Sequence, residues 1–98
     1  MKIKKNMEGK NLLLALEGEL NTNTAPELEA ALSPEIDDAE NVIIDMKQLS
    51  YVTSAGLRIL LTAKKKVSGK GDVILRNVSP VISEIFEITG FAAFLKFE

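Results

Sequence analysis

The sequence predicts a single α/β domain built on a mixed, mostly parallel sheet. The chain has 98 residues, a length that suits one domain with one core. From Val42 onward, short apolar runs alternate with segments of helical periodicity, which is typical of parallel strands joined by right-handed crossovers. The residues before Val42 instead begin with a hairpin pattern, so one antiparallel pair is expected. No linker or repeat interrupts residues 1–98, which we expect to form one domain.

The first residues predict a β-hairpin. Lys2–Met7 is polar and short, as in an edge strand, and residues 8–11 (EGKN) supply a turn. Leu12–Glu17 then predicts a second strand, which ends at the polar residues 18–21.

A helix is expected after this hairpin. Thr24 and Glu27 have the spacing of a capping box, and Pro26 lies in the first turn, where its missing N–H costs little. Ser33–Pro34 predicts the end of this helix. Its apolar positions recur at helical spacing: Leu28, Ala31 and Leu32.

The centre of the chain predicts a strand, a long helix and another strand. Val42–Ile44 is apolar throughout, as in a strand buried on both faces, and residues 45–50 are expected to lead out of it. A helix over residues 54–67 follows and ends at residues 68–71 (SGKG). Val73–Leu75 then predicts the next buried strand.

A third helix and a last strand are expected at the C-terminal end. Ser79 is placed to cap the helix, with Pro80 at its first position and Gly90 as the left-handed residue that ends it. Residues 94–97 predict the last strand. The residues expected to face the core are Val81, Ile82, Ile85, Phe86, Phe94, Leu95 and Phe97.

The composition excludes several kinds of site. The chain has no cysteine and no histidine, which removes disulfides, thiol catalysis and the usual zinc ligands and general bases. With 12 basic and 14 acidic residues, neither sign of charge dominates as it would in a nucleic-acid or membrane-surface protein. The longest apolar run, Leu12–Leu16, is far shorter than the ~20 residues that span a bilayer. We therefore expect a cytoplasmic protein without metal or cofactor.

The stretch SYVTSAGL at residues 50–57 is the candidate functional loop. In open α/β sheets, functional residues collect beyond the carboxyl ends of the strands, and this loop follows the central strand. At 100° per residue, Ser54 lies beside the polar face of the expected helix, four residues before Arg58 and at the positive end of the helix dipole. The expected polar face holds Arg58, Thr62, Lys65 and Lys66. The expected apolar face holds Leu57, Ile59, Leu60, Leu61, Ala63 and Val67, with the stem of Lys64.

Two interpretations of this loop remain open. Serine and threonine are ordinary helix caps, so Ser50, Thr53 and Ser54 can be purely structural. Alternatively, Ser54 can carry a phosphate, because a helix N-terminus favours the added charge of about −1.5 to −2. Gly56, which costs up to ~1 kcal/mol in a helix, indicates close approach by a neighbouring element or by a partner.

Several stretches also carry a family resemblance, and their order and spacing make it fairly specific. They are Gly18–Asn21, Ala25–Leu28, Val42–Met46, Tyr51–Leu57 with Ile59–Leu61, Asn77–Pro80 and Thr89–Phe91. Through them, nearly all of residues 2–98 resembles a STAS domain of the type found in bacterial anti-sigma-factor antagonists. The resemblance implies a sheet with helices packed on one side.

The resemblance also implies a phosphorylation switch. An unphosphorylated antagonist of this family binds an anti-sigma factor that is also a serine kinase using ATP, and so frees the sigma factor. The kinase then phosphorylates a serine at the start of the second helix, the antagonist is released, and a serine phosphatase resets it. The family's phosphoacceptor falls on Ser54. The expected partner-binding residues are Asn21, Thr22, Thr53, Ser54, Ala55, Gly56 and Arg58.

Two positions depart from the family pattern. Family members commonly have an aspartate just before the acceptor, where this chain has Thr53, and another where this chain has Asn21. Both changes remove negative charge near Ser54, and Thr53 becomes an alternative acceptor. They also favour a second reading, a non-phosphorylated interaction or scaffold module of a larger regulatory or transport complex.

An enzyme is the third reading and is not expected. Asp45 is the main acid near the loop, but a carboxylate without a base partner is weak evidence for catalysis. Ordering of the loop is its expected role. Gly69 and Gly71 lack the spacing of a phosphate-cradling motif.

Overall fold

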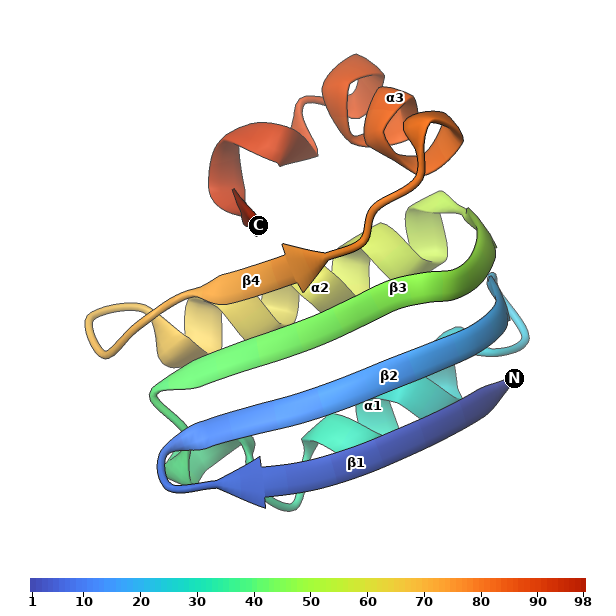
Figure 1. The fold of residues 1–98 in the computed structure, drawn as a ribbon. Coiled ribbons are helices and arrows are strands. Elements are labelled where there is room, and N and C mark those ends of the chain that lie inside the picture. The colour runs from blue at the N-terminus through green and yellow to red at the C-terminus, as the bar shows by residue number, and fades with distance from the viewer.

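Five strands form one sheet in the order β1-β2-β3-β4-β5 in a computed structural model that describes residues 1–98 (Figure 1). The strands are β1 (Lys2–Glu8), β2 (Asn11–Leu20), β3 (Asn41–Val52), β4 (Val73–Arg76) and β5 (Lys96–Phe97). β1 pairs antiparallel with β2, and every other pairing is parallel. The predicted hairpin and the mostly parallel mixed sheet are confirmed.

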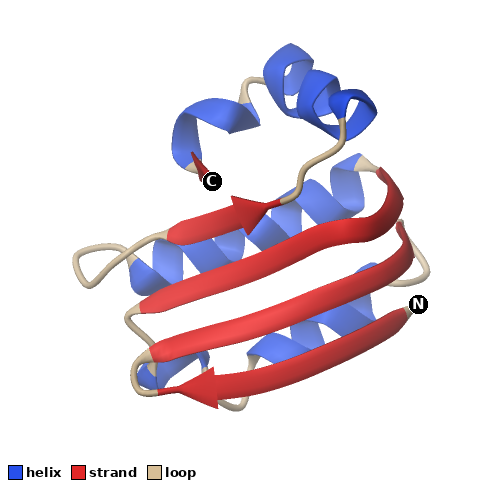
Figure 2. Cartoon of the chain, in the orientation of Figure 1, coloured by secondary structure: helices blue, strands red, loops and turns tan.

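Helices α1 (Ala25–Leu32) and α2 (Ser54–Val67) pack on one face of this sheet, as Figure 2 shows. A short 3₁₀ helix, η1 (Ile36–Asp38), leads from α1 to β3. Helix α3 (Pro80–Thr89) and the 3₁₀ helix η2 (Phe91–Phe94) lie on the β4 side of the sheet, away from β1. The other face of the sheet is uncovered, so the expectation of helices on one side is confirmed. None of the helices combines the length and the hydrophobicity that a membrane-spanning helix requires.

The core lies between the sheet and the helices. Along β2 and the first part of β3, every second side chain points toward the helices, because successive strand residues face opposite sides. The fully buried residues of these strands include Leu12, Leu14, Leu16, Val42, Ile44 and Met46. α2 has the residue bounds that its periodicity predicted, and it buries Leu57, Leu60, Ala63 and Val67.

Both central strands are longer than the sequence predicted. β3 continues to Val52, so the expectation that residues 45–50 leave the strand is wrong. Its buried residues after Ile44 are Met46, Leu49 and Val52, a spacing that departs from the strand period of two. The cause is irregular pairing with β2, whose register shifts twice between Ala15 and Glu19. Such bulges add residues without ending a strand, and they hide its alternation.

The capping box predicted for α1 is absent. Thr24 is the N-cap residue but makes no side-chain capping bond. Its hydroxyl instead donates to the carbonyl of Glu19 at 2.7 Å and accepts from the N–H of Asn21 at 2.8 Å. The hydroxyl therefore stabilises the loop before α1. Pro26 in the first turn and the end of α1 at Leu32 are as predicted.

The predicted caps of α3 are confirmed, but the segment beyond it differs. Ser79 accepts a hydrogen bond from the N–H of Ile82 at 3.3 Å, and Gly90 is left-handed with φ 79°. After Gly90 the chain turns into η2, so Phe94 lies in a 3₁₀ helix and is 54% exposed instead of joining a strand. Val81 is also exposed, and Phe97 is partly exposed with its ring edge against Phe86.

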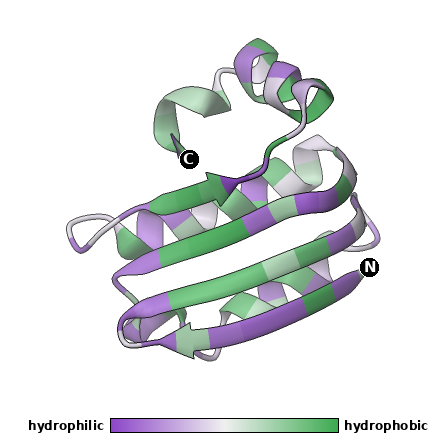
Figure 3. Cartoon of the chain, in the orientation of Figure 1, coloured by the Kyte–Doolittle hydropathy of each residue, from purple (hydrophilic) through white to green (hydrophobic).

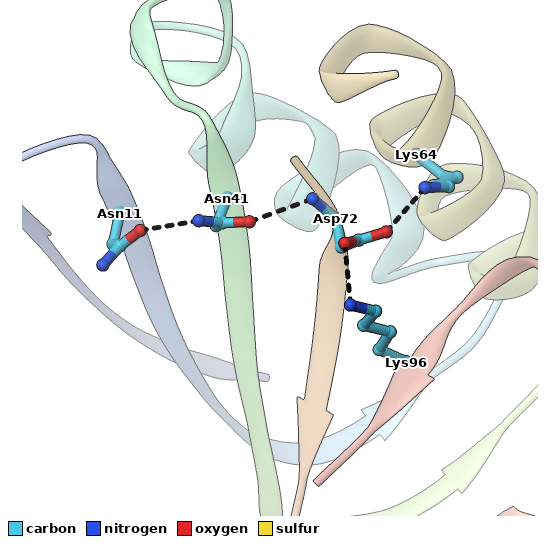
Figure 4. A network of polar contacts seen from close by, with 5 residues as sticks. All are labelled: Asn11, Asn41, Lys64, Asp72 and Lys96. Atoms are coloured by element: carbon cyan, nitrogen blue, oxygen red, sulfur yellow. Dashed lines mark hydrogen bonds and ion pairs between the residues drawn. The ribbon is translucent and has the colours of Figure 1, made fainter. Parts of the chain in front are cut away.

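Polar contacts fasten the strands at the end of the sheet where β3 and β4 begin. Asn41 donates to Asn11 at 3.0 Å and accepts from the N–H of Asp72 at 3.0 Å (Figure 4). Asp72 in turn pairs with Lys64 at 2.9 Å and with Lys96 at 3.2 Å. The network links β2, β3, α2 and β5, so it anchors the short last strand.

Candidate functional site

The candidate site is formed where β3 ends, α2 begins and the β2–α1 loop passes beside them. The N–H of Thr53 donates to the carbonyl of Leu20 at 2.9 Å, which fixes the two segments to each other. Asn21 and Thr22 directly follow Leu20. They therefore lie close to the start of α2, as the sequence analysis expected.

Ser54, the first residue of α2, is exposed and its hydroxyl makes no hydrogen bond within the chain. The N-cap residue is Thr53, which is extended (φ −107°, ψ 175°) and has no side-chain capping bond. Ser50 donates instead to the carbonyl of Gly18 at 3.0 Å, which fastens β3 to β2. None of the three hydroxyls caps α2, so the structure does not support helix capping as their role, although Ser50 has a structural contact of its own.

Thr53 differs from Ser54 in accessibility. Its Oγ1 atom is buried and has no hydrogen-bond partner. A buried hydroxyl cannot reach a kinase without opening of the loop, whereas that of Ser54 faces solvent. Of the two candidate acceptors, Ser54 is therefore the accessible one.

Positive charge extends along the outer face of α2 from Ser54. Arg58 is exposed one turn after Ser54, and no ion pair engages it. Lys65 and Lys66 are exposed further along, and Lys66 has only a long contact of 3.7 Å with Asp37. The first turn of α2 holds no acidic residue. The start of this helix is therefore electrostatically suited to an anionic group.

The β2–α1 loop presents a mixed surface. The Oδ1 atom of Asn21 accepts from the N–H groups of Asn23 at 2.9 Å and of Thr24 at 3.1 Å, so this side chain shapes the loop. Thr22 is exposed, and Ala55 on the facing helix is half-buried. A partner that contacts Ser54 would meet Thr22 more readily than the amide of Asn21.

Gly56 is buried and serves packing. A Cβ atom there would lie 2.7 Å from Cδ2 of Leu20 and 3.1 Å from Cγ2 of Val52. Of the two explanations for this glycine, the structure supports close approach by a neighbouring element. Gly56 consequently offers a partner no side chain and little surface.

Asp45 lies away from this loop, in the middle of β3 on the uncovered face, which corrects the expected location. Its Oδ1 accepts from Nδ2 of Asn77 and from the N–H of Lys47, both at 2.9 Å. These hydrogen bonds, that of Asn77 first, hold the pKa of the Asp45 carboxyl below its ordinary value. Asp45 therefore orders the β4–α3 connection. No group of acidic residues in the chain is arranged to hold a metal ion.

Tyr51 is an exposed residue of the site that the sequence did not predict as a partner contact. It pairs with Glu19 across the β2–β3 ladder and is 45% exposed, three residues before Ser54. Exposed tyrosines are frequent anchors of protein interfaces. The available signal was its place as the one aromatic residue in the SYVTSAGL stretch.

Comparison with known proteins identifies relatives over most of the chain. The STAS domain family model matches residues 2–98. A putative anti-sigma factor antagonist, BtrV, of Bordetella bronchiseptica is 40% identical over 82 residues, which cover 82% of this chain and 71% of that protein. The anti-sigma-B factor antagonist of Staphylococcus aureus is 35% identical over 75 residues, covering 74% of this chain and 69% of that protein.

Solved structures show the same fold. The anti-sigma factor antagonist SpoIIAA in its unphosphorylated form matches with a TM-score of 0.79 and 22% identity, over 99% of this chain and 87% of that one. The phosphorylated form of SpoIIAA, from Bacillus, matches with a TM-score of 0.76 over 99% of this chain and 91% of that one. At this level of identity the two structures establish the fold alone.

Proposed function

The chain belongs to the STAS domain family, and on that basis we propose that it is an anti-sigma-factor antagonist controlled by phosphorylation of Ser54. In the unmodified state it binds an anti-sigma factor, and the phosphate on Ser54 releases it. One structural observation carries the proposal: the exposed hydroxyl of Ser54 stands at the start of α2 without a capping bond. The names of the BtrV and Staphylococcus aureus relatives support the same role.

The geometry favours a switch that changes the surface and leaves the fold intact. A phosphate on Ser54 would lie at the positive end of the α2 dipole, one turn from the unpaired Arg58. Both features stabilise the added charge of about −1.5 to −2. A partner surface fitted to the neutral hydroxyl, however, would then face desolvation and charge costs of several kcal/mol. Phosphorylation therefore lowers the affinity for the partner.

The proposed partners follow from this cycle. The anti-sigma factor is itself a serine kinase using ATP, and a serine phosphatase restores the unmodified hydroxyl. The chain has no catalytic role or cofactor of its own and acts in the cytoplasm. Its contact surface consists of Thr22, Ser54, Ala55 and Arg58, with Tyr51 beside them.

The first test is intact-mass measurement with fragment mapping on the protein isolated from its native host, with and without phosphatase treatment. A phosphatase-sensitive phosphate on Ser54 is the expected result. Absence of this phosphate under every growth and stress condition would favour the scaffold reading. The observation that favours the scaffold module as a second candidate is that Asn21 and Thr53 are neutral.

Affinity capture from the native host tests the consequence of the phosphate. Ser54→Ala should retain the partner kinase, and Ser54→Asp should lose it because the carboxylate mimics part of the phosphate charge. Ser68→Asp is the matched control, since it adds the same charge at an exposed position at the other end of α2. Equal capture by Ser54→Ala and Ser54→Asp would contradict the proposal.

A further inference from the structure

The uncovered face of the sheet carries an ordered pattern of side chains. Residues paired across neighbouring strands point to the same face, so the register arranges them in rows. A central row contains Asn6, Leu13, Ile43, Ile74 and, on the edge strand β5, Lys96. Toward the start of β1 lies a second row of Lys4, Ala15, Asp45 and Arg76, and toward its end a third row of Glu8, Asn11 and Asn41. Figure 3 shows that β1 is largely hydrophilic, whereas β2, the first part of β3 and β4 are largely hydrophobic.

This face also has a depression and unpaired charges. A groove of about 250 Å³ lies over Ala15, whose small side chain separates Lys4 on one side from Asp45 on the other. Neither Lys4 nor Glu8 forms an ion pair within the chain. Glu8 accepts a hydrogen bond from Nδ2 of Asn6 at 3.0 Å, but its charge is not neutralised. The face therefore offers an apolar centre, a hollow and two charges without an ion pair.

We propose that this face binds the same face of a second copy of the chain, around a twofold axis that runs along the central row. Such an axis places each residue of the second row opposite a residue of the third row on the same strand of the other copy. Lys4 then faces Glu8 of the second copy, and Glu8 faces Lys4. Two ion pairs form by symmetry over β1, one on each side of the axis, next to the stacked Leu13 of β2 and Ile43 of β3.

The remaining positions agree with this arrangement. Asn11 comes to lie over Ala15 of the second copy and enters the groove. The Nδ2 group of Asn11 has no acceptor within its own chain, and the Oδ2 atom of Asp45 beside the groove has no donor. Along β1 to β4 this arrangement brings no like charges together. On β5, Lys96 lies on the axis and faces Lys96 of the second copy, but each Lys96 is paired with Asp72 of its own chain at 3.2 Å.

Charge also excludes the other principal arrangement. A twofold axis parallel to the strands, between β2 and β3, would place β1 over β4 of the second copy. Lys4 would then face Arg76, and this pair of like charges would oppose association. The axis along the central row gives two Lys4–Glu8 pairs of opposite charge against the single Lys96 pair, so it is the arrangement that the charges favour.

The dimer is compatible with binding of a regulatory partner. Helices α1 and α2 cover the opposite face of the sheet (Figure 1), and Ser54 is exposed at the start of α2. Both copies would keep this site free. The inference does not depend on the proposed function.

Sedimentation velocity over a series of protein concentrations tests the pairing on the purified full chain. The expected result is a reversible shift from the monomer mass of 10.7 kDa to twice that value. Lys4→Glu should weaken the association about tenfold, because it replaces two attractive pairs by two repulsive ones. The exchange variant Lys4→Glu/Glu8→Lys should restore it, because the opposite charges face each other again.

Lys65→Glu is the matched control, an equal change of charge at an exposed lysine on α2. It should leave the dissociation constant unchanged. Circular dichroism verifies that each variant keeps the fold, which is expected because Lys4 and Glu8 are exposed. A chain that stays monomeric, a Lys4→Glu variant that dimerises like the parent, or an exchange variant that fails to recover would each overturn the proposal.

Discussion

Gly56 in the first turn of α2 lies directly against Leu20 at the end of β2. A Cβ atom at Gly56 would approach Cδ2 of Leu20 to 2.7 Å, closer than real Cβ contacts allow. Leu20 is itself fully buried, so it has little room to move away. This contact sets how close the start of α2, with Ser54, sits to the end of the sheet.

Gly56→Ala should therefore destabilise the fold, although alanine is the better helix former by ~1 kcal/mol. Overpacking in a full core costs about 1–3 kcal/mol, which leaves a net loss in the free energy of unfolding. Urea denaturation measures it. The added Leu20→Ala exchange makes room for the methyl group, so the double variant should lose less than the sum of the two single losses. Strict additivity would show that Leu20 is not the obstacle.

The sequence was most informative where one structural period continues without interruption. The bounds of α2, the caps of α3 and the short strand β4 all came from local periodicity and turn residues. The second half of β3 was missed because its bulged pairing with β2 removes the alternation that marks a strand. That pairing depends on a neighbour distant in sequence, and no local pattern reveals it.

For the candidate site, too, the sequence predicted some features and not others. Position along the helix was sufficient to predict that Ser54 and Arg58 are exposed. Whether a hydroxyl near the start of α2 caps the helix depends on where its side chain lies in the folded chain, and none of the three does so. Ser50 finds the carbonyl of Gly18, and Thr53 is left buried without a partner. Such choices are decided by tertiary contacts, so composition and spacing left them open.

Two serines at helix starts should respond differently to alanine. Ser79 caps α3 through the N–H of Ile82, so Ser79→Ala should lower the free energy of unfolding by about 1 kcal/mol. Ser54 makes no such bond, and Ser54→Ala should stay within about 0.5 kcal/mol of the parent. Parallel urea titrations of the two variants make the comparison. A loss at Ser54 equal to that at Ser79 would return Ser54 to the role of a structural cap.

Asn77 should tolerate glycine better than alanine. It has a positive φ of 56° and donates a hydrogen bond to Asp45 at 2.9 Å. Asn77→Ala loses this bond and strains the backbone, with an expected cost of about 1–2 kcal/mol. Asn77→Gly loses the same bond but adopts this backbone conformation without strain, so its cost should be smaller. Thermal unfolding ranks the two variants, and the reverse order would mean that the conformation at Asn77 carries no strain.

The acid stability of the fold should depend on Asp72 (Figure 4). Hydrogen bonds from Lys64 and then Lys96 hold the pKa of the Asp72 carboxyl below its ordinary value of 3.8. A carboxyl whose pKa is lower in the folded state stabilises the fold above its unfolded pKa, and this contribution is lost as the pH falls through the folded pKa. At about pH 7 the free energy of unfolding of the parent chain should therefore be higher than that of the Asp72→Asn variant. This difference should become smaller toward about pH 3.

The two lysines provide the matched test of this cause. Replacing both Lys64 and Lys96 by glutamine removes the groups that lower the pKa of Asp72. We expect the free energy of unfolding of this double variant to depend less on pH than that of the parent. The reduction should match the one seen in Asp72→Asn, and urea titration across the acid range measures both. Because the pairs are partly exposed, added salt should reduce the same difference at about pH 7. A difference between the parent and Asp72→Asn that stays constant with pH would show that the carboxyl of Asp72 does not act through its charge.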